Sequence, residues 1–339
     1  NKQGLIEVVK SNVPRIDYTD TTNGVLLLEK AATNLETKSN EFTAWGTNSN
    51  VTKTANYIVS PDGTQNATRL QFTSNGFSAS TPQSLATYTI SCYAKRNDSG
   101  TQNVGFFTNG SGVVNSAWAV TSEWKRFSYT FPALNGSFMG IAGDSGADIS
   151  VYGFQIEGLV SYASSYIPTS GSTVQRAADV ANNAGNSEVF NDSEGVLFAN
   201  VDFLTLSGND YFGLNDGTNN QRVLIQRTIT NIKTYINSGV ELIAPISSTI
   251  NKISISYKSN NYKLYLNGFK VATNTSSSVT PSGLNAFEFE LGGGFNLFAH
   301  LKAKEIGYYD AILTDSELEY LTSYRSLIEL VKELNLNTL

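Results

Sequence analysis

Short apolar runs in which every second residue is polar recur along most of the chain, and this two-residue period is the pattern of β-strands with one buried face. In the segment KISISY, Ile253 and Ile255 share one face and Ser254 lies on the other. Turn-forming clusters such as Pro61-Asp62-Gly63 separate these runs. The pattern predicts an all-β chain of short strands.

The predicted strands form two series. The first comprises residues 56–59, 67–72, 88–95, 103–107, 126–131, 138–142 and 149–156. The second comprises residues 195–206, 211–214, 222–227, 233–236, 252–257, 262–266, 286–291 and 303–309. Such series of short strands with turns between them are typical of β-sandwiches and jelly rolls.

The segment from Asp148 to Val180 divides the two series. It begins as a strand that is apolar on both faces and continues into a Ser-rich stretch with Pro168 and Gly171, which favour turns and extended chain. A length of 339 residues also exceeds what one hydrophobic core usually supports. We therefore predict an N-terminal arm at 1–35, a first sandwich at 36–180, a second sandwich at 181–312 and a C-terminal helix at 313–339.

Two features mark the ends of the chain. In the arm, apolar runs on either side of a turn at residues 21–24 predict a hairpin that adds to a sheet edge, in its own chain or on a neighbouring subunit. At the other end, Thr314 and Glu317 form a capping box, with Leu313 and Leu318 placed as a hydrophobic staple. Apolar residues recur at three- and four-residue spacing from there on, which predicts a helix of about five turns; they are Leu318, Leu321, Leu327, Ile328, Val331 and Leu334. The helix is expected to dock on its own sandwich, and packing with partners on an oligomer axis is the alternative.

The charge balance excludes some classes of partner. The chain carries a net charge of -6 and no basic run, so we expect no nucleic-acid groove, which would need clustered Lys and Arg. No run of about 18 apolar residues and no signal peptide occur, so no membrane insertion is expected.

Cysteine and histidine are each present once. Cys92 falls on the apolar face of the strand at 88–95, which predicts a buried, unreactive thiol. A single His300 excludes a two-histidine zinc site, and no G-x-S-x-G nucleophile turn occurs. We therefore predict no catalytic residue, no metal centre and no cofactor.

Paired carboxylates leave one enzymatic alternative open. In AFEFELGGG, Glu288 and Glu290 share a strand face, and alternate side chains on a strand lie about 6 to 7 Å apart. A retaining glycosidase needs about 5 to 5.5 Å between its carboxyl groups, which flexible glutamates can reach. Any amphipathic strand shows this pattern, however, so we expect the two residues to lie on a solvated face.

Sugar binding needs aromatic planes and amide or carboxylate partners for hydroxyl groups. Among the tryptophans, Trp45 and Trp124 are expected in the core, and Trp118, after a Gly- and Asn-rich segment, is a candidate ligand contact. A second candidate is the segment SGNDYFGLNDGTNNQR, interpreted as a loop; it offers Asn209, Asp210, Tyr211, Asn215 and Asp216. The loop is a candidate for a glycan or a structural calcium ion, whose preferred ligands are oxygens, and a solvated hairpin is the other interpretation.

Several segments resemble bacteriophage virion proteins of the tail-fibre and head-fibre (head spike) type. In the first half they are NKQGLIEVVKSNVPRIDYTD, GVLLLEKAATNLETKSNEFTAW, SPDGTQNATRL and FQIEGLVSYASSYIPTSGSTVQRAADV. KISISYKSNNYKLYLNG and YYDAILTDSELEYLTSY resemble a laminin-G-like or concanavalin-like sandwich. The resemblance implies a carbohydrate-binding-module-like jelly roll followed by that second sandwich.

The sequence as a whole predicts two tandem sandwiches and a structural, adhesive function. The resemblance implies a virion fibre or spike protein that binds host-surface polysaccharide, contacts other virion proteins and forms a homo-oligomer, expected to be a trimer. Two alternatives stay open, a polysaccharide-degrading hydrolase or lyase and a virion component without a ligand.

Overall fold

The computed structural model describes residues 1–324, except residues 20, 81–82, 86, 109–111, 115–117, 132–133, 206–207, 247–249 and 293–294. The described residues form strands almost throughout, with one α-helix near their C-terminal end. The predicted all-β class with a C-terminal helix is confirmed. None of the described helices is long and apolar enough to span a bilayer.

The chain forms two compact units, each described here by itself. Unit 1 contains Asn1–Val8 and Ala31–Ala177, and unit 2 contains Val9–Lys30 and Ala178–Leu339. The chain thus changes unit close to the Ser-rich stretch. The segment treated in the sequence as one arm is divided between the units.

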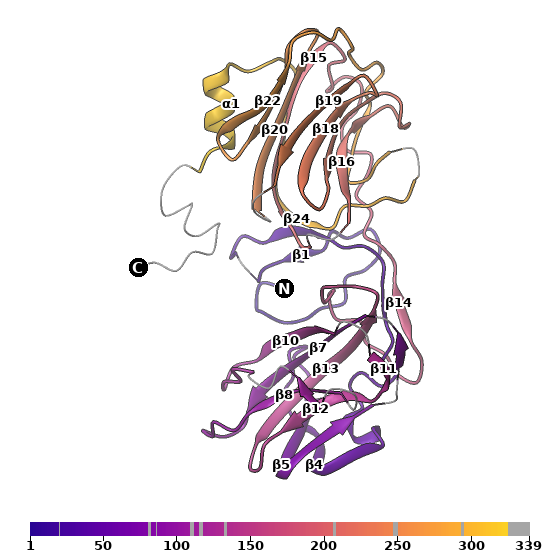
Figure 1. The fold of residues 1–339 in the computed structure, drawn as a ribbon, viewed down its shortest axis with the longest axis vertical. Coiled ribbons are helices and arrows are strands. Elements are labelled where there is room, and N and C mark those ends of the chain that lie inside the picture. The colour runs from indigo at the N-terminus through magenta and orange to yellow at the C-terminus, as the bar shows by residue number, and fades with distance from the viewer. Residues whose placement is uncertain are drawn as a thin grey trace. The chain divides into compact units, whose positions relative to one another are not determined.

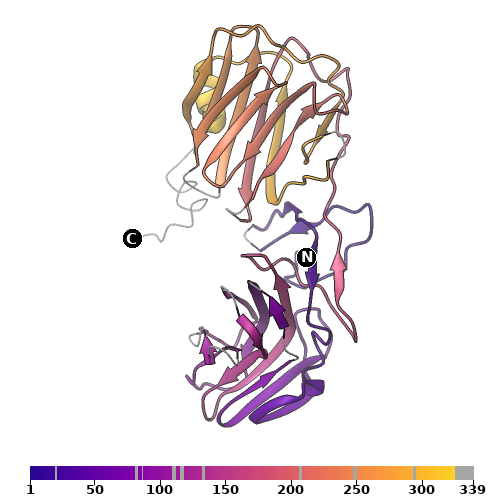
Figure 2. The same cartoon turned by 45° about the vertical axis from the view of Figure 1, so that its right-hand side comes forward.

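Unit 1 is built around one large, bent sheet. Its elements are β3 (Ala32–Asn34), the 3-10 helix η1 (Phe42–Ala44), β4 (Thr47–Ile58), β5 (Ala67–Ala79), β6 (Gln83–Leu85), β7 (Tyr88–Arg96), β8 (Val104–Thr108), β9 (Gly112–Val114), β10 (Lys125–Phe131), β11 (Leu134–Ser137), β12 (Met139–Gly143), β13 (Asp148–Gly158) and β14 (Val174–Arg176). The order in the sheet is β10-β7-β13-β5-β12-β8-β9, with β4 paired to β5. The long strands β4 and β5 are labelled in Figure 1 and lie at the lower end of the same unit in Figure 2.

The bend of strand β5 lets one sheet wrap around the core of unit 1. Residues 68–71 pair with β13, and residues 76–79 pair with β12. The enclosed core is strongly aromatic and includes Trp45, Phe106 and Phe154. Cys92 lies in it, fully buried, as its strand pattern predicts.

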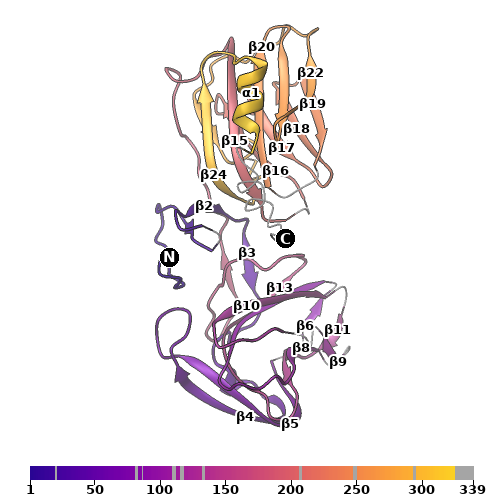
Figure 3. The same cartoon turned by 90° about the vertical axis from the view of Figure 1, so that its left-hand side faces the viewer.

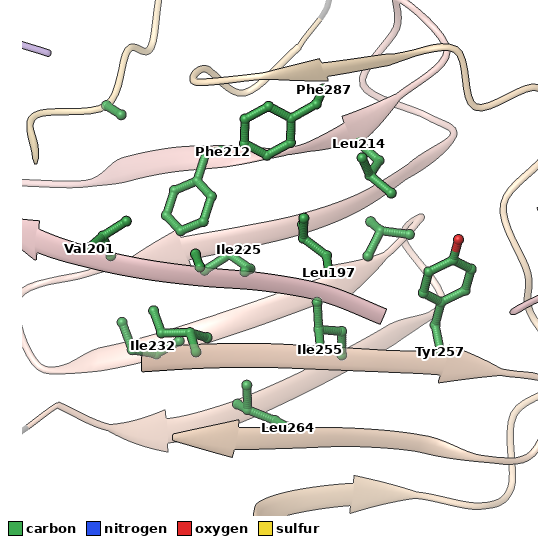
Figure 4. Close-up of a cluster of buried hydrophobic side chains, with 14 of the residues drawn as sticks. Leu197, Val201, Phe212, Leu214, Ile225, Ile232, Ile255, Tyr257, Leu264 and Phe287 are labelled. Atoms are coloured by element: carbon green, nitrogen blue, oxygen red, sulfur yellow. The ribbon is translucent and has the colours of Figure 1, made fainter. Parts of the chain in front are cut away.

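Unit 2 is a sandwich of a seven-stranded and a five-stranded sheet. Its elements are β1 (Ile16–Asp17), β2 (Val25–Leu28), β15 (Glu194–Phe203), β16 (Asp210–Asn215), β17 (Arg222–Arg227), β18 (Asn231–Ile236), β19 (Val240–Pro245), β20 (Ile250–Lys258), β21 (Tyr262–Leu266), β22 (Phe269–Asn274), β23 (Ala286–Glu288), β24 (Leu301–Tyr309) and α1 (Asp315–Thr322). The sheet orders are β1-β2-β24-β15-β20-β21-β22 and β19-β18-β17-β16-β23. Figure 4 shows apolar side chains of both sheets meeting, among them Leu197 and Ile255 from one and Phe212 and Ile225 from the other.

The N-terminal hairpin adds to an edge of the larger sheet. Strands β1 and β2 pair with each other, and Leu26–Leu28 pair with Leu301–Ala303 of β24. The hairpin is also tied by ion pairs between Arg15 and both Glu29 and Asp179.

Helix α1 is shorter than the five turns expected. It begins with the predicted capping box at Thr314 and Glu317, and it ends because the backbone of Ser323 is extended. Leu318 is fully buried against Val196 and Tyr265, so α1 docks on its own sandwich, over β15 and β20 (Figure 3). The apolar stripe at Leu327, Ile328, Val331 and Leu334 lies outside the described residues.

Candidate functional site

The outer face of the five-stranded sheet carries a group of polar and aromatic side chains. In β18, Ile232 and Ile236 point into the core, so Lys233 and Tyr235 point outward. The same alternation turns Arg222 and Gln226 of β17 outward, because Val223 and Ile225 fill the core. We call this surface the tyrosine–arginine face and define it as Tyr211, Arg222, Gln226, Lys233, Tyr235 and Glu241.

Strand register brings these residues together from four strands. Tyr211 of β16 lies opposite Gln226 of β17, and Gln226 lies opposite Lys233 of β18. Tyr235 of β18 lies opposite Glu241 of β19. Helix α1 contacts β15, β20, β21 and β22 of the other sheet and leaves this face uncovered.

A single amide group connects the two tyrosines. The Gln226 side chain donates from Nε2 to the Tyr211 hydroxyl at 3.1 Å and accepts from the Tyr235 hydroxyl at 3.0 Å through Oε1. All three side chains are partly exposed. The two phenol rings are therefore held in fixed positions while a part of each remains open to solvent.

An ion pair completes the network at Glu241. Its Oε1 accepts from Lys233 Nζ at 3.0 Å and lies 2.9 Å from the Tyr235 hydroxyl, whose single proton is shared between Glu241 and Gln226. The hydrogen bond from Lys233 and that from Tyr235 lower the pKa of Glu241. Burial, followed by the contact with Glu241, raises the pKa of Tyr235. The phenol thus stays protonated and the carboxyl ionised over a wide pH range around neutrality.

Arg222 lies beside the tyrosines. Its guanidinium carbon is 5.5 Å from the centre of the Tyr235 ring, within the range of a cation–π contact. Burial lowers the pKa of Arg222. The face therefore presents aromatic rings, an amide, a carboxylate and two cations within one sheet surface.

The glutamate pair is close to this face but is covered. Glu288 and Glu290 point away from the core, as their alternation with Phe287 and Phe289 requires. The expected solvated face is wrong, because the side chains are only 6% and 7% exposed. The chain after β23 folds back, with the Leu291 N–H donating to the Leu297 carbonyl.

Neither carboxyl of this pair is open to a glycosidic bond. Glu288 accepts a hydrogen bond of 2.8 Å from the side-chain amide of Asn215, and burial together with Glu288 raises the pKa of Glu290. A raised carboxyl pKa suits a general acid, yet a hydrolase also needs its substrate within hydrogen-bond reach. The structure gives no support for the glycosidase alternative.

The segment interpreted as a ligand loop is strand β16, which separates the predicted ligand residues. Asn209, Asp210 and Tyr211 lie at its start, and Asn215 and Asp216 at its end, five residues away at about 3.3 Å each. A strand was predicted at residues 211–214, but the amide-rich turns on both sides led to the interpretation of the whole segment as a loop. Of the five, only Tyr211 belongs to the tyrosine–arginine face.

Asp210 lies in the interior of unit 2, where its contacts are with other residues of the protein. It is fully buried and forms ion pairs with Arg227 at 2.7 Å and with Lys30 at 3.1 Å. It also accepts the main-chain N–H of His300 at 3.0 Å. His300 itself is buried and accepts from the Lys30 N–H at 3.3 Å through Nδ1, so it is part of this internal cluster.

The remaining loop residues make local contacts. The Asn209 carbonyl accepts from the Lys30 ammonium at 2.7 Å, and Asn215 is buried against Glu288. Asp216 accepts from the Thr218 N–H at 2.9 Å, closing a turn. Among the described residues, no group of three or more His, Cys, Asp and Glu side chains is placed to hold a metal ion.

Two of the three tryptophans, Trp118 and Trp124, occupy places different from those predicted. Trp118 is only 5% exposed, and its ring stacks on Phe127 at 4.7 Å and meets Phe106 edge-on. It fills the core of unit 1 and presents no surface to a ligand. Trp45 is buried as expected, whereas Trp124 is partly exposed, with its indole N–H donating to the Val59 carbonyl at 3.1 Å.

Unit 2 also contains an apolar cavity of about 420 Å³ between the edges of its two sheets. Its walls include Leu197, Leu214, Phe287 and Ile306. Most of its lining is apolar, although Lys304, Glu305 and Tyr308 also border it, and it shares no residue with the tyrosine–arginine face.

Comparisons with known proteins gave distant structural likenesses only. No protein-family model matches the chain, and no curated protein matches it. The CBM40 of the Ruminococcus gnavus IT-sialidase, bound to alpha2,3 sialyllactose, is similar with 15% identity and a TM-score of 0.35, over 42% of this chain and 94% of that chain. The CBM22-1–CBM22-2 tandem domain of Paenibacillus barcinonensis Xyn10C is similar with 11% identity and a TM-score of 0.31, over 83% and 98%. The Trypanosoma rangeli sialidase in complex with 2,3-difluorosialic acid follows with 14% identity and a TM-score of 0.32, over 40% of this chain and 24% of that chain.

Proposed function

We propose that this chain binds glycans and that the tyrosine–arginine face of unit 2 is its binding surface. The observation that carries the proposal is the pair of partly exposed tyrosines, Tyr211 and Tyr235, fixed by the single amide of Gln226. Aromatic rings cover the apolar faces of pyranose rings, and a sheet surface suits an extended chain of sugars.

The polar groups around the rings supply partners for sugar hydroxyls. Gln226 and Glu241 provide acceptors, and Lys233 and Arg222 provide donors, all on the same surface. Because hydrogen bonds within the protein already join these side chains, binding does not have to order them, which lowers its entropic cost.

We further propose that the chain acts as an adhesive, non-catalytic component of a virion fibre or spike and forms a homotrimer. Support for this setting is the resemblance of the segments in both halves of the sequence to phage fibre proteins. Light scattering on the native chain and on a chain ending at Thr314 measures the mass of the particle. A trimeric mass supports the proposed fibre or spike component, and a monomeric mass contradicts the proposed homotrimer.

Binding is tested by aromatic truncation on the face. Wild-type protein is screened on a glycan array, and the affinity for the best glycan is measured by calorimetry for Tyr211→Ala and Tyr235→Ala. Each variant is expected to bind about tenfold or more weakly, since an aromatic contact of about 1.5 kcal/mol corresponds to that factor.

The matched control is Tyr309→Ala, which removes an exposed tyrosine from β24 of the other sheet. It should bind as the wild type does. Equal affinity of all three variants, or the absence of any retained glycan, overturns the proposal.

A further inference from the structure

We infer that the tyrosine–arginine face selects acidic sugars and that Arg222 is the residue that recognises their carboxylate. This inference rests on the proposed glycan-binding function and adds the chemical class of the ligand.

Arg222 differs from three other arginines of the chain in its partners. Arg15, Arg69 and Arg227 each form an ion pair with at least one carboxylate. For Arg222, no described residue offers an acceptor to its buried Nε and Nη1 atoms. Leaving buried donors without acceptors costs free energy, more for charged groups than for neutral ones. Those two atoms are covered by the protein, so a ligand can meet only the part of the Arg222 side chain that stays exposed. There a bound carboxylate would supply the ionic partner that Arg222 lacks.

The charges on the face leave Arg222 as the uncompensated group. Lys233 and Glu241 form an ion pair and offset each other. Glu288 lies on strand β23, next to β16; it accepts a hydrogen bond from the Asn215 amide and is almost fully buried. Burial lowers the pKa of Arg222, and among the described residues no carboxylate is found to raise it. The surface therefore has one positive charge to offer, on a chain whose net charge is -6.

The geometry suits a carboxylate attached to a stacked sugar ring. A planar guanidinium presents two parallel N–H groups to a carboxylate, which a lysine ammonium does not. Because the Arg222 guanidinium lies over the Tyr235 ring, a sugar in contact with the tyrosines brings a substituent of its own ring within reach of the cation. A neutral sugar leaves Arg222 without an ionic partner.

The test uses pairs of glycans that differ only in charge. A panel of galacturonate, glucuronate and mannuronate oligomers and sialyllactose is compared with the carboxyl-reduced, neutral form of each. Wild-type protein is expected to bind at least one acidic member about tenfold or more tightly than its neutral form. The preference should shrink as salt rises, since a partly exposed ion pair is screened.

Variants then test whether Arg222 causes the preference for acidic glycans. Arg222→Gln should bind the acidic and neutral forms alike, and Arg222→Lys should keep only a part of the preference. Lys258→Gln is the matched control, because it removes a positive charge from β20 on the other sheet, where Lys258 pairs with Glu194. Circular dichroism verifies that each variant is folded.

The outcomes separate the two proposals. If neutral and acidic forms bind the wild type equally, the acidic preference is overturned and glycan binding stands. If a preference persists in Arg222→Gln, the role of Arg222 is overturned. If no member of the panel and no array glycan binds, both proposals fall.

Discussion

Replacement of Asp210 by asparagine should destabilise unit 2 strongly, although Asp210 belongs to the predicted ligand loop. The carboxylate is completely buried and pairs with Arg227, which is also completely buried, while Lys30 and the His300 N–H contact the other oxygen. An asparagine side chain at this position would keep the shape but remove the charge. Arg227 would then be a buried cation whose carboxylate partner is gone.

The magnitude follows from the cost of leaving a buried charge unpaired. Breaking such a pair from one side costs about 3–5 kcal/mol. For a domain of about 150 to 250 residues, each kcal/mol shifts the melting temperature by about 2–4 °C. The expected loss is therefore about 6 to 20 °C in the transition of unit 2.

Calorimetry and urea unfolding measure this loss of stability. Two further variants show whether the unpaired buried charge causes it. Asp216→Asn, at a partly exposed carboxylate beyond the other end of β16, should change stability by less than about 1 kcal/mol. The double variant Asp210→Leu with Arg227→Met should recover much of the loss, because no buried charge remains. A loss below about 1 kcal/mol in Asp210→Asn would refute the reasoning, as would a loss of glycan binding without a loss of stability.

Three more predictions follow from local contacts. The hydrogen bond from Lys233 lowers the pKa of Glu241, so the ionised Glu241 contributes fully to folding above the ordinary glutamate pKa of about 4.3. This contribution is lost as the pH falls through the lowered pKa. Carboxyl NMR should give a titration midpoint below about 4.3 that rises in Lys233→Gln, and an unchanged midpoint contradicts this. Thr314→Ala should cost about 1 kcal/mol in urea unfolding through loss of the capping box, against little change in Ser316→Ala, and equal effects would count against the cap. Burial raises the pKa of the Cys92 thiol, so a thiol reagent should label it only in urea, and rapid labelling of the native chain would show that the strand opens.

The strand pattern was largely predictable from the sequence because alternation is a local property. Strand β17 was predicted with its observed bounds, Arg222–Arg227. Strand β4, Thr47–Ile58, was predicted only at its end, because its side chains are mostly polar and exposed and give no apolar alternation. Its place is set by pairing along β5, which involves residues distant in sequence.

The candidate site could not be predicted from the sequence in the same way. Tyr235 and Gln226 lie in strands that were predicted, and their outward direction follows from the alternation. Their meeting depends on the register of β17 with β18, which no single segment encodes. Trp118 and Asp210 were candidates because amides and aromatic residues surround them in the sequence. Both are buried by residues of other segments, Trp118 by Phe127 of β10 and Asp210 by Arg227 across the β16–β17 pair.

The order of the two units along the chain bears on how such a protein can be diversified. Residues 31–177 of unit 1 interrupt unit 2, whose strands β1 and β2 precede them and whose other strands follow them. The entry and exit of this segment are neighbours, because β3 pairs with β14 and Ala32 lies opposite Arg176, about 5 Å away for an antiparallel pair. A recombination event could therefore exchange the intervening segment for another with similarly adjacent ends, and the sandwich that carries the tyrosines would keep every strand it needs.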